Sequence, residues 1–139
     1  MVILCGGRGT RLQVHTQAIP KPLVQIGGMP ILWHVISLYA AQGHEHFLLA
    51  TGYKRELIEH FVADHRWPHG VQVSCVDTGR DTPTGGRVRA VGEMLGRRRF
   101  AVTYADGVAD VNLAAVSRFH DGHDGLPRSP WSARSCSSA

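Results

Sequence analysis

Apolar runs of strand length alternate with helical patterns along most of this chain, and no other feature of the sequence restricts the fold as strongly. The predicted strands cover residues 2–5, 47–51, 71–76 and 100–104, and the predicted helices cover residues 31–41, 55–63, 86–95 and 113–120. Strands that alternate with helices form a mostly parallel sheet whose two faces are covered by helices. The sequence therefore predicts a three-layer α/β fold.

The size and composition of the chain fit one globular domain. Its 139 residues are 43% hydrophobic, and no stretch approaches the ~20 consecutive apolar residues of a membrane span. Met1 opens directly into a strand-like run rather than a leader, so we expect a cytoplasmic protein with no membrane partner. Cys5, Cys75 and Cys136 have neither the even count of a disulfide framework nor the spacing of a zinc site, so we expect reduced thiols.

The formal net charge of +4 favours anionic partners. A nucleic-acid surface needs basic residues along one face and aromatic side chains for stacking. Here the aromatic residues lie within apolar runs, and residues 97–99 form the only tight basic run. We therefore expect no nucleic-acid partner.

A glycine-rich loop follows the first predicted strand, in the stretch LCGGRGTRL at residues 4–12. Gly6, Gly7 and Gly9 allow backbone N–H groups to approach a phosphate, and Arg11 can offer two parallel hydrogen bonds to it. The stretch matches neither G-x-x-x-x-G-K-[ST] nor G-x-G-x-x-G, which argues against a P-loop NTPase and a nicotinamide dehydrogenase. A tight turn without a ligand is the alternative interpretation of this loop.

Two further segments support a ligand site. The stretch YADG at residues 104–107 leaves the last predicted strand at the same sheet edge as the glycine-rich loop, and ligands of parallel sheets bind at this edge. Lys21 lies between two prolines in IPKPL, residues 19–23, which fixes the backbone on both sides and suits a cation that must point at one place. A rigid solvent loop is the alternative, and the nearby glycine-rich loop makes it less favourable.

The motif GGRGTRL at residues 6–12, followed by PKP at residues 20–22, resembles the signature of the sugar-phosphate nucleotidyltransferases, also called nucleotide-sugar pyrophosphorylases. The resemblance extends from residue 1 to about residue 123. It includes TYADGVADVNL at residues 103–113, where Ala105 replaces the usual glycine.

Within this family, the chain is most similar to the glucose-1-phosphate cytidylyltransferase branch. The stretch VDTGRDTPTGGRV at residues 76–88 is the most distinctive segment of that branch, and residues 31–54 are also similar to it. Many family members have a proline soon after residue 12, whereas here Gln13, Val14 and His15 occupy this stretch, as in the cytidylyltransferase branch.

The resemblance implies a Rossmann-like three-layer nucleotidyltransferase fold and a specific reaction. An oxygen of a sugar 1-phosphate attacks the α-phosphorus of a nucleoside triphosphate, and pyrophosphate leaves. The expected partners are CTP and glucose 1-phosphate, the expected product is CDP-glucose, and the expected cofactor is Mg²⁺. A homo-oligomer is the arrangement that the family allows, and the state of this chain stays open.

The resemblance also implies residues for binding the phosphates. Arg11 and Lys21 are the implied catalytic cations, Arg11 on the triphosphate and Lys21 at the reacting phosphates. The implied residues around the triphosphate are Gly6, Gly7, Gly9 and Thr10. Such a reaction brings two polyanions together, so positioning and charge neutralisation carry most of the catalysis.

Metal and base contacts are implied in the same way. Asp106 is the implied Mg²⁺ ligand, in agreement with a hard cation that takes one or two carboxylates and keeps its waters. The residues implied to lie near the base and the sugar are Thr84, Gly85, Gly86 and Arg87.

Two alternatives to cytidylyl transfer stay open at this point. The first keeps the reaction and changes the nucleotide to UTP or dTTP. The second is a catalytically inactive, truncated nucleotide-binding fragment, because the second metal carboxylate of the family lies beyond the length of this chain.

The last sixteen residues differ in composition from the rest. The stretch DGLPRSPWSARSCSSA, residues 124–139, contains five serines and no run that predicts a strand or helix. We predict that residues 1–123 are the N-terminal part of a catalytic domain, and that residues 124–139 are an unstructured tail produced by a frameshift. With freely chosen codons, one added base converts the tail into a run containing LATVTVV, which is typical of a strand.

Overall fold

The computed structural model describes residues 1–7, 19–96 and 98–122 of the chain. The chain divides into two compact units, Met1–Val108 and Ala109–Ala139. Three predicted site residues, Gly9, Thr10 and Arg11, lie outside the described ranges, and so does the predicted tail at residues 124–139.

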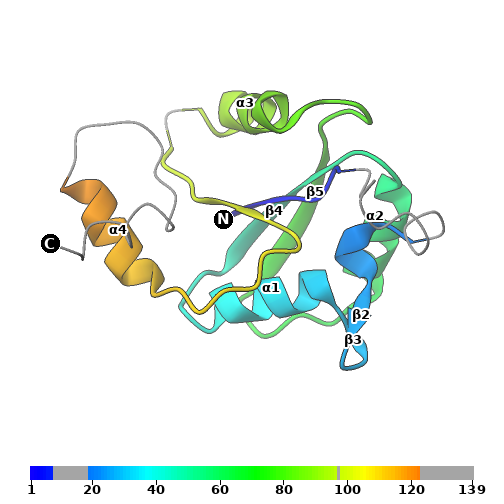
Figure 1. The fold of residues 1–139 in the computed structure, drawn as a ribbon, viewed down its shortest axis with the longest axis horizontal. Coiled ribbons are helices and arrows are strands. Elements are labelled where there is room, and N and C mark those ends of the chain that lie inside the picture. The colour runs from blue at the N-terminus through cyan, green and yellow to red at the C-terminus, as the bar shows by residue number, and fades with distance from the viewer. Residues whose placement is uncertain (8–18, 97, 123–139) are drawn as a thin grey trace, which may run out of the picture. The chain divides into compact units, whose positions relative to one another are not determined.

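Four parallel strands form the central sheet of the first unit (Figure 1). They are β1 (Val2–Leu4), β4 (His46–Thr51), β5 (Gln72–Asp77) and β6 (Val102–Tyr104), in the spatial order β5-β4-β1-β6. Strand β1 lies between β4 and β6, because Val2 pairs in parallel with Leu48 on one side and with Val102 on the other. The predicted mostly parallel sheet is confirmed.

Burial along the strands follows their place in the sheet. Val2, Ile3 and Leu4 of β1 are all buried, as expected for a central parallel strand with helices on both faces. Strand β6 is one of the two edge strands of the described sheet, and β5 is the other. Val102 and Tyr104 of β6 remain 41% and 56% exposed.

Helix α3 (Thr84–Leu95) covers one face of the sheet. Its buried residue Val91 packs with Val2, Leu4 and Ala50, which share this face because side chains alternate along a strand. The partly buried residues packed against this cluster are Leu48, Val88, Leu95 and Phe100.

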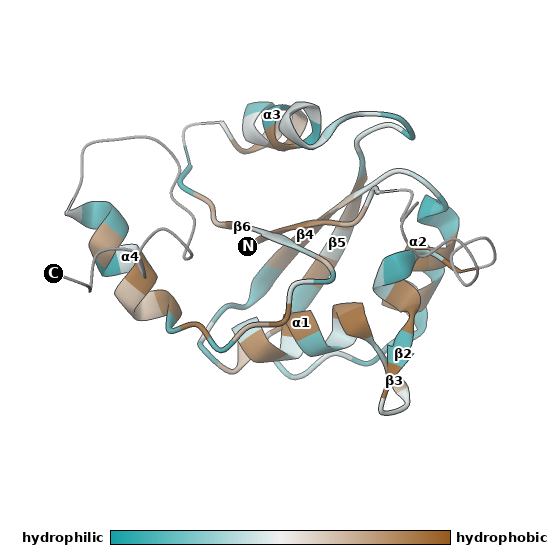
Figure 2. Cartoon of the chain, viewed as in Figure 1, coloured by the Kyte–Doolittle hydropathy of each residue, from teal (hydrophilic) through white to brown (hydrophobic). Residues whose placement is uncertain are grey.

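Helices α1 (Ile31–Ala40) and α2 (Arg55–Asp64) lie on the other face (Figure 1). The hydroxyl of Tyr39 in α1 donates a hydrogen bond of 3.1 Å to Oγ1 of Thr103. Thr103 pairs with Ile3, whose side chain points away from the α3 face. Figure 2 shows hydrophobic residues along the central strands and α1, whereas α2 and α3 carry both hydrophobic and hydrophilic residues. The three-layer α/β fold is thus confirmed.

The strand order reverses at β1, and this reversal positions the site. The chain proceeds from β1 outward to β4 and β5, and it then places β6 on the opposite side of β1. All four strands are parallel, so their carboxyl ends meet at one edge. In doubly wound sheets, ligands bind at this edge, at the point of reversal.

Two short elements before α1 were not predicted from the apolar pattern. A 3-10 turn covers Lys21–Leu23, and an antiparallel hairpin joins β2 (Gln25–Ile26) to β3 (Met29–Pro30). The two residues between these strands, Gly27 and Gly28, have φ angles of 59° and 83°. Two consecutive positive φ angles are the requirement of a tight hairpin turn, and glycine meets it without strain.

The described part of the second unit contains helix α4 (Leu113–Asp121). The helix begins after Asn112, whose side-chain oxygen accepts a hydrogen bond of 2.9 Å from the backbone N–H of Ala115. This contact satisfies a donor that has no partner within the helix. None of the helices in the described ranges is long and apolar enough to cross a membrane.

Substitutions at two neighbouring residues of α2 test the packing of this helix. Ile58 is fully buried, whereas Leu57 is 38% exposed. We expect Ile58→Ala to lower the free energy of unfolding by about 2–5 kcal/mol, because it leaves a cavity in the core. The matched control Leu57→Ala is expected to cost less than about 1 kcal/mol. Urea unfolding followed by circular dichroism measures both, and equal losses would contradict the observed orientation of α2.

Candidate functional site

The candidate site lies where β1 and β6 end, beside the point of strand reversal. Gly6 and Gly7 follow β1, and Ala105 and Asp106 follow β6. The backbone N–H of Ala105 donates a hydrogen bond of 3.3 Å to the carbonyl oxygen of Leu4, which keeps the two strand ends together. Gly6 is buried and Gly7 is exposed, so the chain emerges from the sheet between these two residues.

Lys21 is held by local backbone structure. Pro20 precedes the 3-10 turn in an extended conformation, with φ of −64° and ψ of 143°. Pro20 and Pro22 are both buried, and the backbone N–H of Val24 donates to the carbonyl oxygen of Lys21. The backbone of Lys21 is thus fixed by a 3-10 turn as well as by its two prolines. The apolar pattern of the sequence did not predict this turn.

Lys21 and Asp106 form an ion pair. The Nζ atom of Lys21 contacts Oδ2 of Asp106, and the two side chains are 35% and 33% exposed. The structure thus brings together the predicted catalytic lysine and the predicted metal carboxylate, which lie far apart in the sequence. An ion pair with this exposure is worth at most about 1 kcal/mol of folding free energy, because solvent screens it.

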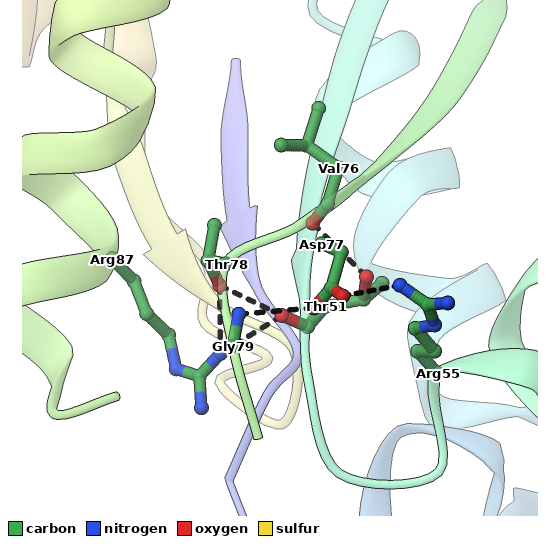
Figure 3. A network of polar contacts seen from close by, with 7 residues as sticks. All are labelled: Thr51, Arg55, Val76, Asp77, Thr78, Gly79 and Arg87. Carbon is green, nitrogen blue, oxygen red and sulfur yellow. Dashed lines mark hydrogen bonds and ion pairs between the residues drawn. The ribbon is translucent and has the colours of Figure 1, made fainter. Parts of the chain in front are cut away.

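Arg87 occupies a different environment from the other predicted site residues. The residue is only 4% exposed, and its guanidinium donates four hydrogen bonds to oxygen atoms of the protein. Figure 3 shows Arg87 with two of its partners, Thr51 and Thr78. Nη1 donates to the carbonyl oxygen of Thr51 at 2.8 Å and to Oγ1 of Thr78 at 2.6 Å. Nη2 donates to the carbonyl oxygens of Gly6 at 3.0 Å and Arg80 at 3.3 Å.

The charge of Arg87 persists in this buried position. Burial lowers the pKa of the guanidinium, whereas the carboxylates of Asp77 and Asp81 act in the opposite direction. The side chain stays protonated, because the guanidinium of arginine does not lose its proton in proteins. All four hydrogen-bond acceptors are neutral carbonyl or hydroxyl oxygens. The guanidinium therefore places a positive charge next to Gly6, at the start of the glycine-rich loop.

Two glycines make room for this guanidinium. A Cβ atom added to Gly6 would collide with Nη1 and Cζ of Arg87. A Cβ atom added to Gly52, which follows β4, would lie 2.5 Å from Nη1 of Arg87 and 2.5 Å from the carbonyl oxygen of Gly79. A Cβ atom added to Gly7 would meet no atom within 4 Å, so of the two loop glycines that the structure describes, only Gly6 is required by packing within the protein.

The remaining predicted residues, Thr84, Gly85 and Gly86, form the first turn of α3. Thr84 and Gly85 are exposed, whereas Gly86 is half-buried. Backbone N–H groups in the first turn of a helix have no partner within the helix. These three residues therefore place backbone N–H groups without a helical partner at the start of α3.

The polar network at the ends of β4 and β5 was not predicted from the sequence (Figure 3). Thr51 donates from Oγ1 to the carbonyl oxygen of Val76 at 3.0 Å, and Thr78 donates from Oγ1 to the carbonyl oxygen of Thr51 at 2.7 Å. Asp77 accepts from Arg55 and from the backbone N–H of Gly79. The available signal was the pair of Thr and Gly residues that closes both strands, in TGY at 51–53 and DTG at 77–79.

An open hollow of about 450 Å³ lies beside this network. It is lined by polar and charged residues after β4 and β5, among them Tyr53, Arg55, Asp77 and Arg80. The guanidinium carbon of Arg80 lies 5.5 Å from the centre of the Tyr53 ring, within the range of a cation–π contact. The hollow contains none of the predicted site residues that the structure describes.

The described side chains offer few ligands for a metal ion. The described ranges contain no group of three or more His, Cys, Asp or Glu side chains that could hold a metal. Asp106 offers a single, partly exposed carboxylate. One carboxylate fits Mg²⁺ when phosphate oxygens and water supply the other ligands, and it does not fit a metal held by the protein alone.

A doubly wound parallel sheet that groups glycines, a lysine and a carboxylate at its point of reversal is typical of α/β proteins that bind phosphorylated ligands. Comparison with known proteins makes this class specific. The chain belongs to the nucleotidyl transferase family, whose model matches residues 1–126.

Individual relatives agree with this assignment. The chain is 38% identical to a probable glucose-1-phosphate cytidylyltransferase of Bacillus subtilis, over 86% of this chain and 54% of the relative. It is 35% identical to a mannose-1-phosphate guanylyltransferase of Mycobacterium tuberculosis, over 86% of this chain and 33% of the relative. The fold matches the crystal structure of HddC from Yersinia pseudotuberculosis complexed with GMP-PN, with a TM-score of 0.70 and 28% identity, over 85% of this chain and 52% of that chain. The chain thus spans about half the length of its cytidylyltransferase relative.

Two glycine substitutions test the packing around Arg87. We expect Gly52→Ala to lower the free energy of unfolding by about 1–3 kcal/mol, because the new Cβ overpacks the site against Arg87 and the Gly79 carbonyl. The matched control is Gly85→Ala, where an added Cβ meets no atom within 4 Å. Alanine in a helix is favoured over glycine, so the control is expected to gain up to about 1 kcal/mol. Urea unfolding measures both variants, and a Gly52→Ala variant as stable as the natural chain would contradict the observed packing.

Proposed function

We propose that this chain is part of an enzyme that transfers a cytidylyl group from CTP to glucose 1-phosphate, giving CDP-glucose and pyrophosphate. Membership of the nucleotidyl transferase family and the 38% identity to the Bacillus subtilis relative support the proposal. The single observation that carries it is the pairing of Lys21 with Asp106 beside Gly6 and Gly7, at the point of strand reversal.

In this proposal, backbone and cations hold the triphosphate. The N–H groups of the glycine-rich loop, which contains Gly6, Gly7, Gly9 and Thr10, surround the phosphates, and Arg11 binds them as a charged partner. Lys21 lies at the reacting phosphates, where it offsets the charge of two polyanions that must approach each other. Fixed donors aimed at developing charge are the main source of catalysis in reactions of this type.

Asp106 is proposed to hold Mg²⁺ together with the phosphates. When bound, Mg²⁺ neutralises phosphate charge that the protein's own cations do not reach. In the ligand-free protein Lys21 and Asp106 pair with each other. In this proposal a phosphate becomes the partner of Lys21, and a metal ion becomes the partner of Asp106. Thr84, Gly85 and Gly86 are proposed to lie near the base and the sugar, because they begin α3, where backbone N–H groups have no partner within the helix.

Specific observations favour two alternatives. The first is transfer from another nucleoside triphosphate. UTP and dTTP are the alternatives named above, and the 35% identity to a mannose-1-phosphate guanylyltransferase adds GTP. The chain spans about half the length of its cytidylyltransferase relative, and the inactive nucleotide-binding fragment stays the second alternative to be tested. The frameshift origin of residues 124–139 stays a prediction, and the DNA sequence beyond the coding region tests it.

Pyrophosphate release from the purified chain tests the proposed reaction. We expect release with CTP, glucose 1-phosphate and Mg²⁺, and slower release with UTP, dTTP or GTP. Release that is as fast or faster with UTP would overturn the choice of nucleotide. No release with any triphosphate, combined with measurable CTP binding by calorimetry, would favour the inactive fragment.

Calorimetric titration of CTP at constant salt tests the roles of Lys21 and Asp106. Lys21→Ala removes a charged partner of the phosphates, so CTP affinity should fall about tenfold or more. Asp106→Asn should weaken CTP binding in Mg²⁺, because it removes the metal ligand. In EDTA the affinity should not fall, because the substitution only frees Lys21 from its carboxylate partner.

A matched control for Asp106→Asn is Glu93→Gln, which also removes an exposed carboxylate from an ion pair. We expect Glu93→Gln to leave CTP affinity unchanged under both conditions. Equal losses of affinity in Asp106→Asn with and without Mg²⁺ would indicate that Asp106 has a structural role.

A further inference from the structure

We propose that Arg87 is a positioning residue that fixes the direction of the Gly7 backbone N–H at the start of the glycine-rich loop. The side chain links the carboxyl ends of three neighbouring strands, so it acts on the loop from beneath the sheet edge. The consequence for ligand binding rests on the proposed function, whereas the effect on the loop does not.

The guanidinium is the centre of a four-bond clamp. It binds the carbonyl of Gly6 after β1, the carbonyl of Thr51 at the end of β4, and two groups after β5, namely the hydroxyl of Thr78 and the carbonyl of Arg80. Each terminal nitrogen makes two of these bonds. A planar group with donors in fixed directions can join acceptors from separate strands, and the flexible ammonium of lysine cannot reproduce this geometry.

The clamp is anchored on the protein core. Arg87 and Val91 lie four residues apart on α3, so their side chains lie on the same face of the helix. Val91 is fully buried against Val2, Leu4 and Ala50 of the sheet. The packing of α3 therefore places the guanidinium at the strand ends with little freedom to move.

The bond to Gly6 determines the orientation of a neighbouring group. The carbonyl of Gly6 and the N–H of Gly7 belong to the same peptide unit, which is planar, and the described chain has no cis peptide bonds. In a trans peptide, the N–H points in the direction opposite to the carbonyl. Because Arg87 binds the Gly6 carbonyl from within the protein, the N–H of exposed Gly7 is directed away from the core, where the phosphates are proposed to bind.

This arrangement separates Arg87 from the residues proposed to touch the ligand. Both terminal nitrogens are already engaged by protein oxygens, and the residue is 4% exposed. A direct contact of either terminal nitrogen with the nucleotide would require bonds of the clamp to break. The predicted role of Arg87 beside the base and sugar is thus replaced in this proposal by an indirect role.

Arg87→Lys separates geometry from charge, because it keeps the positive charge and loses the planar donors. Arg89→Lys is the matched control, since Arg89 lies two residues further along α3 with an exposed side chain paired to Glu93. Two readouts are needed: the CTP dissociation constant by calorimetry, and backbone amide signals and hydrogen exchange by NMR. The informative amides are Gly7, Cys5, which donates to Ala50, and Thr78, which donates to Thr51.

We expect Arg87→Lys to shift the Gly7 amide signal, to accelerate exchange at Cys5 and Thr78, and to weaken CTP binding about tenfold or more. Arg89→Lys should change none of these. Unchanged Gly7, Cys5 and Thr78 amides in Arg87→Lys would overturn the proposal, even if CTP affinity is lost, because that combination indicates direct contact with the nucleotide. If the natural chain binds no CTP, the proposed function fails, and the amide readouts still decide the role of Arg87.

Rescue with a small molecule covers the case in which substitution prevents folding. Arg87→Ala leaves space where the guanidinium lay, together with four acceptors that have lost their donor. We expect added guanidinium ion at millimolar concentration to restore the natural Gly7 and Cys5 amide signals in Arg87→Ala, and to leave Arg89→Ala unaffected. Failure to restore these signals would overturn the proposal.

Discussion

The position of β1 between β4 and β6 is the constraint on which the rest of the structure depends. Its three residues are buried on both faces, so helices must cover both sides of the sheet. The chain adds β4 on one side of β1 and later β6 on the other side, so the strand order reverses at β1. The layers, the sheet edge and the place of the site all follow from this one short strand.

The regular elements could be predicted because each depends on a local pattern. The runs at residues 2–5 and 47–51 have the composition of buried strands, and the eight predicted elements all occur in the structure with small differences at their ends. The hairpin between β2 and β3 escaped prediction, since strands of two residues have no measurable period. Its signal was the Gly27–Gly28 pair, which marks a turn rather than a strand.

The candidate site was predictable only in part, for a physical reason. Motif resemblance indicated Lys21 and Asp106, and the structure brings these two together. The surroundings of Arg87 were not predictable, because Gly6 follows β1 and Thr51 ends β4, and both contribute backbone oxygens. Every residue carries a backbone oxygen, so no sequence pattern predicts which of these oxygens will accept a hydrogen bond from Arg87.

The collision between a Cβ atom at residue 6 and the Arg87 guanidinium makes these two positions one epistatic unit. The tolerated residue at one position depends on the residue at the other, although they lie on different elements. A smaller residue at 87 would lift the restriction on residue 6 while giving up the clamp. Evolution of this sheet edge therefore has to change the two positions in a particular order, and a side chain at residue 6 becomes accessible only after Arg87 is lost.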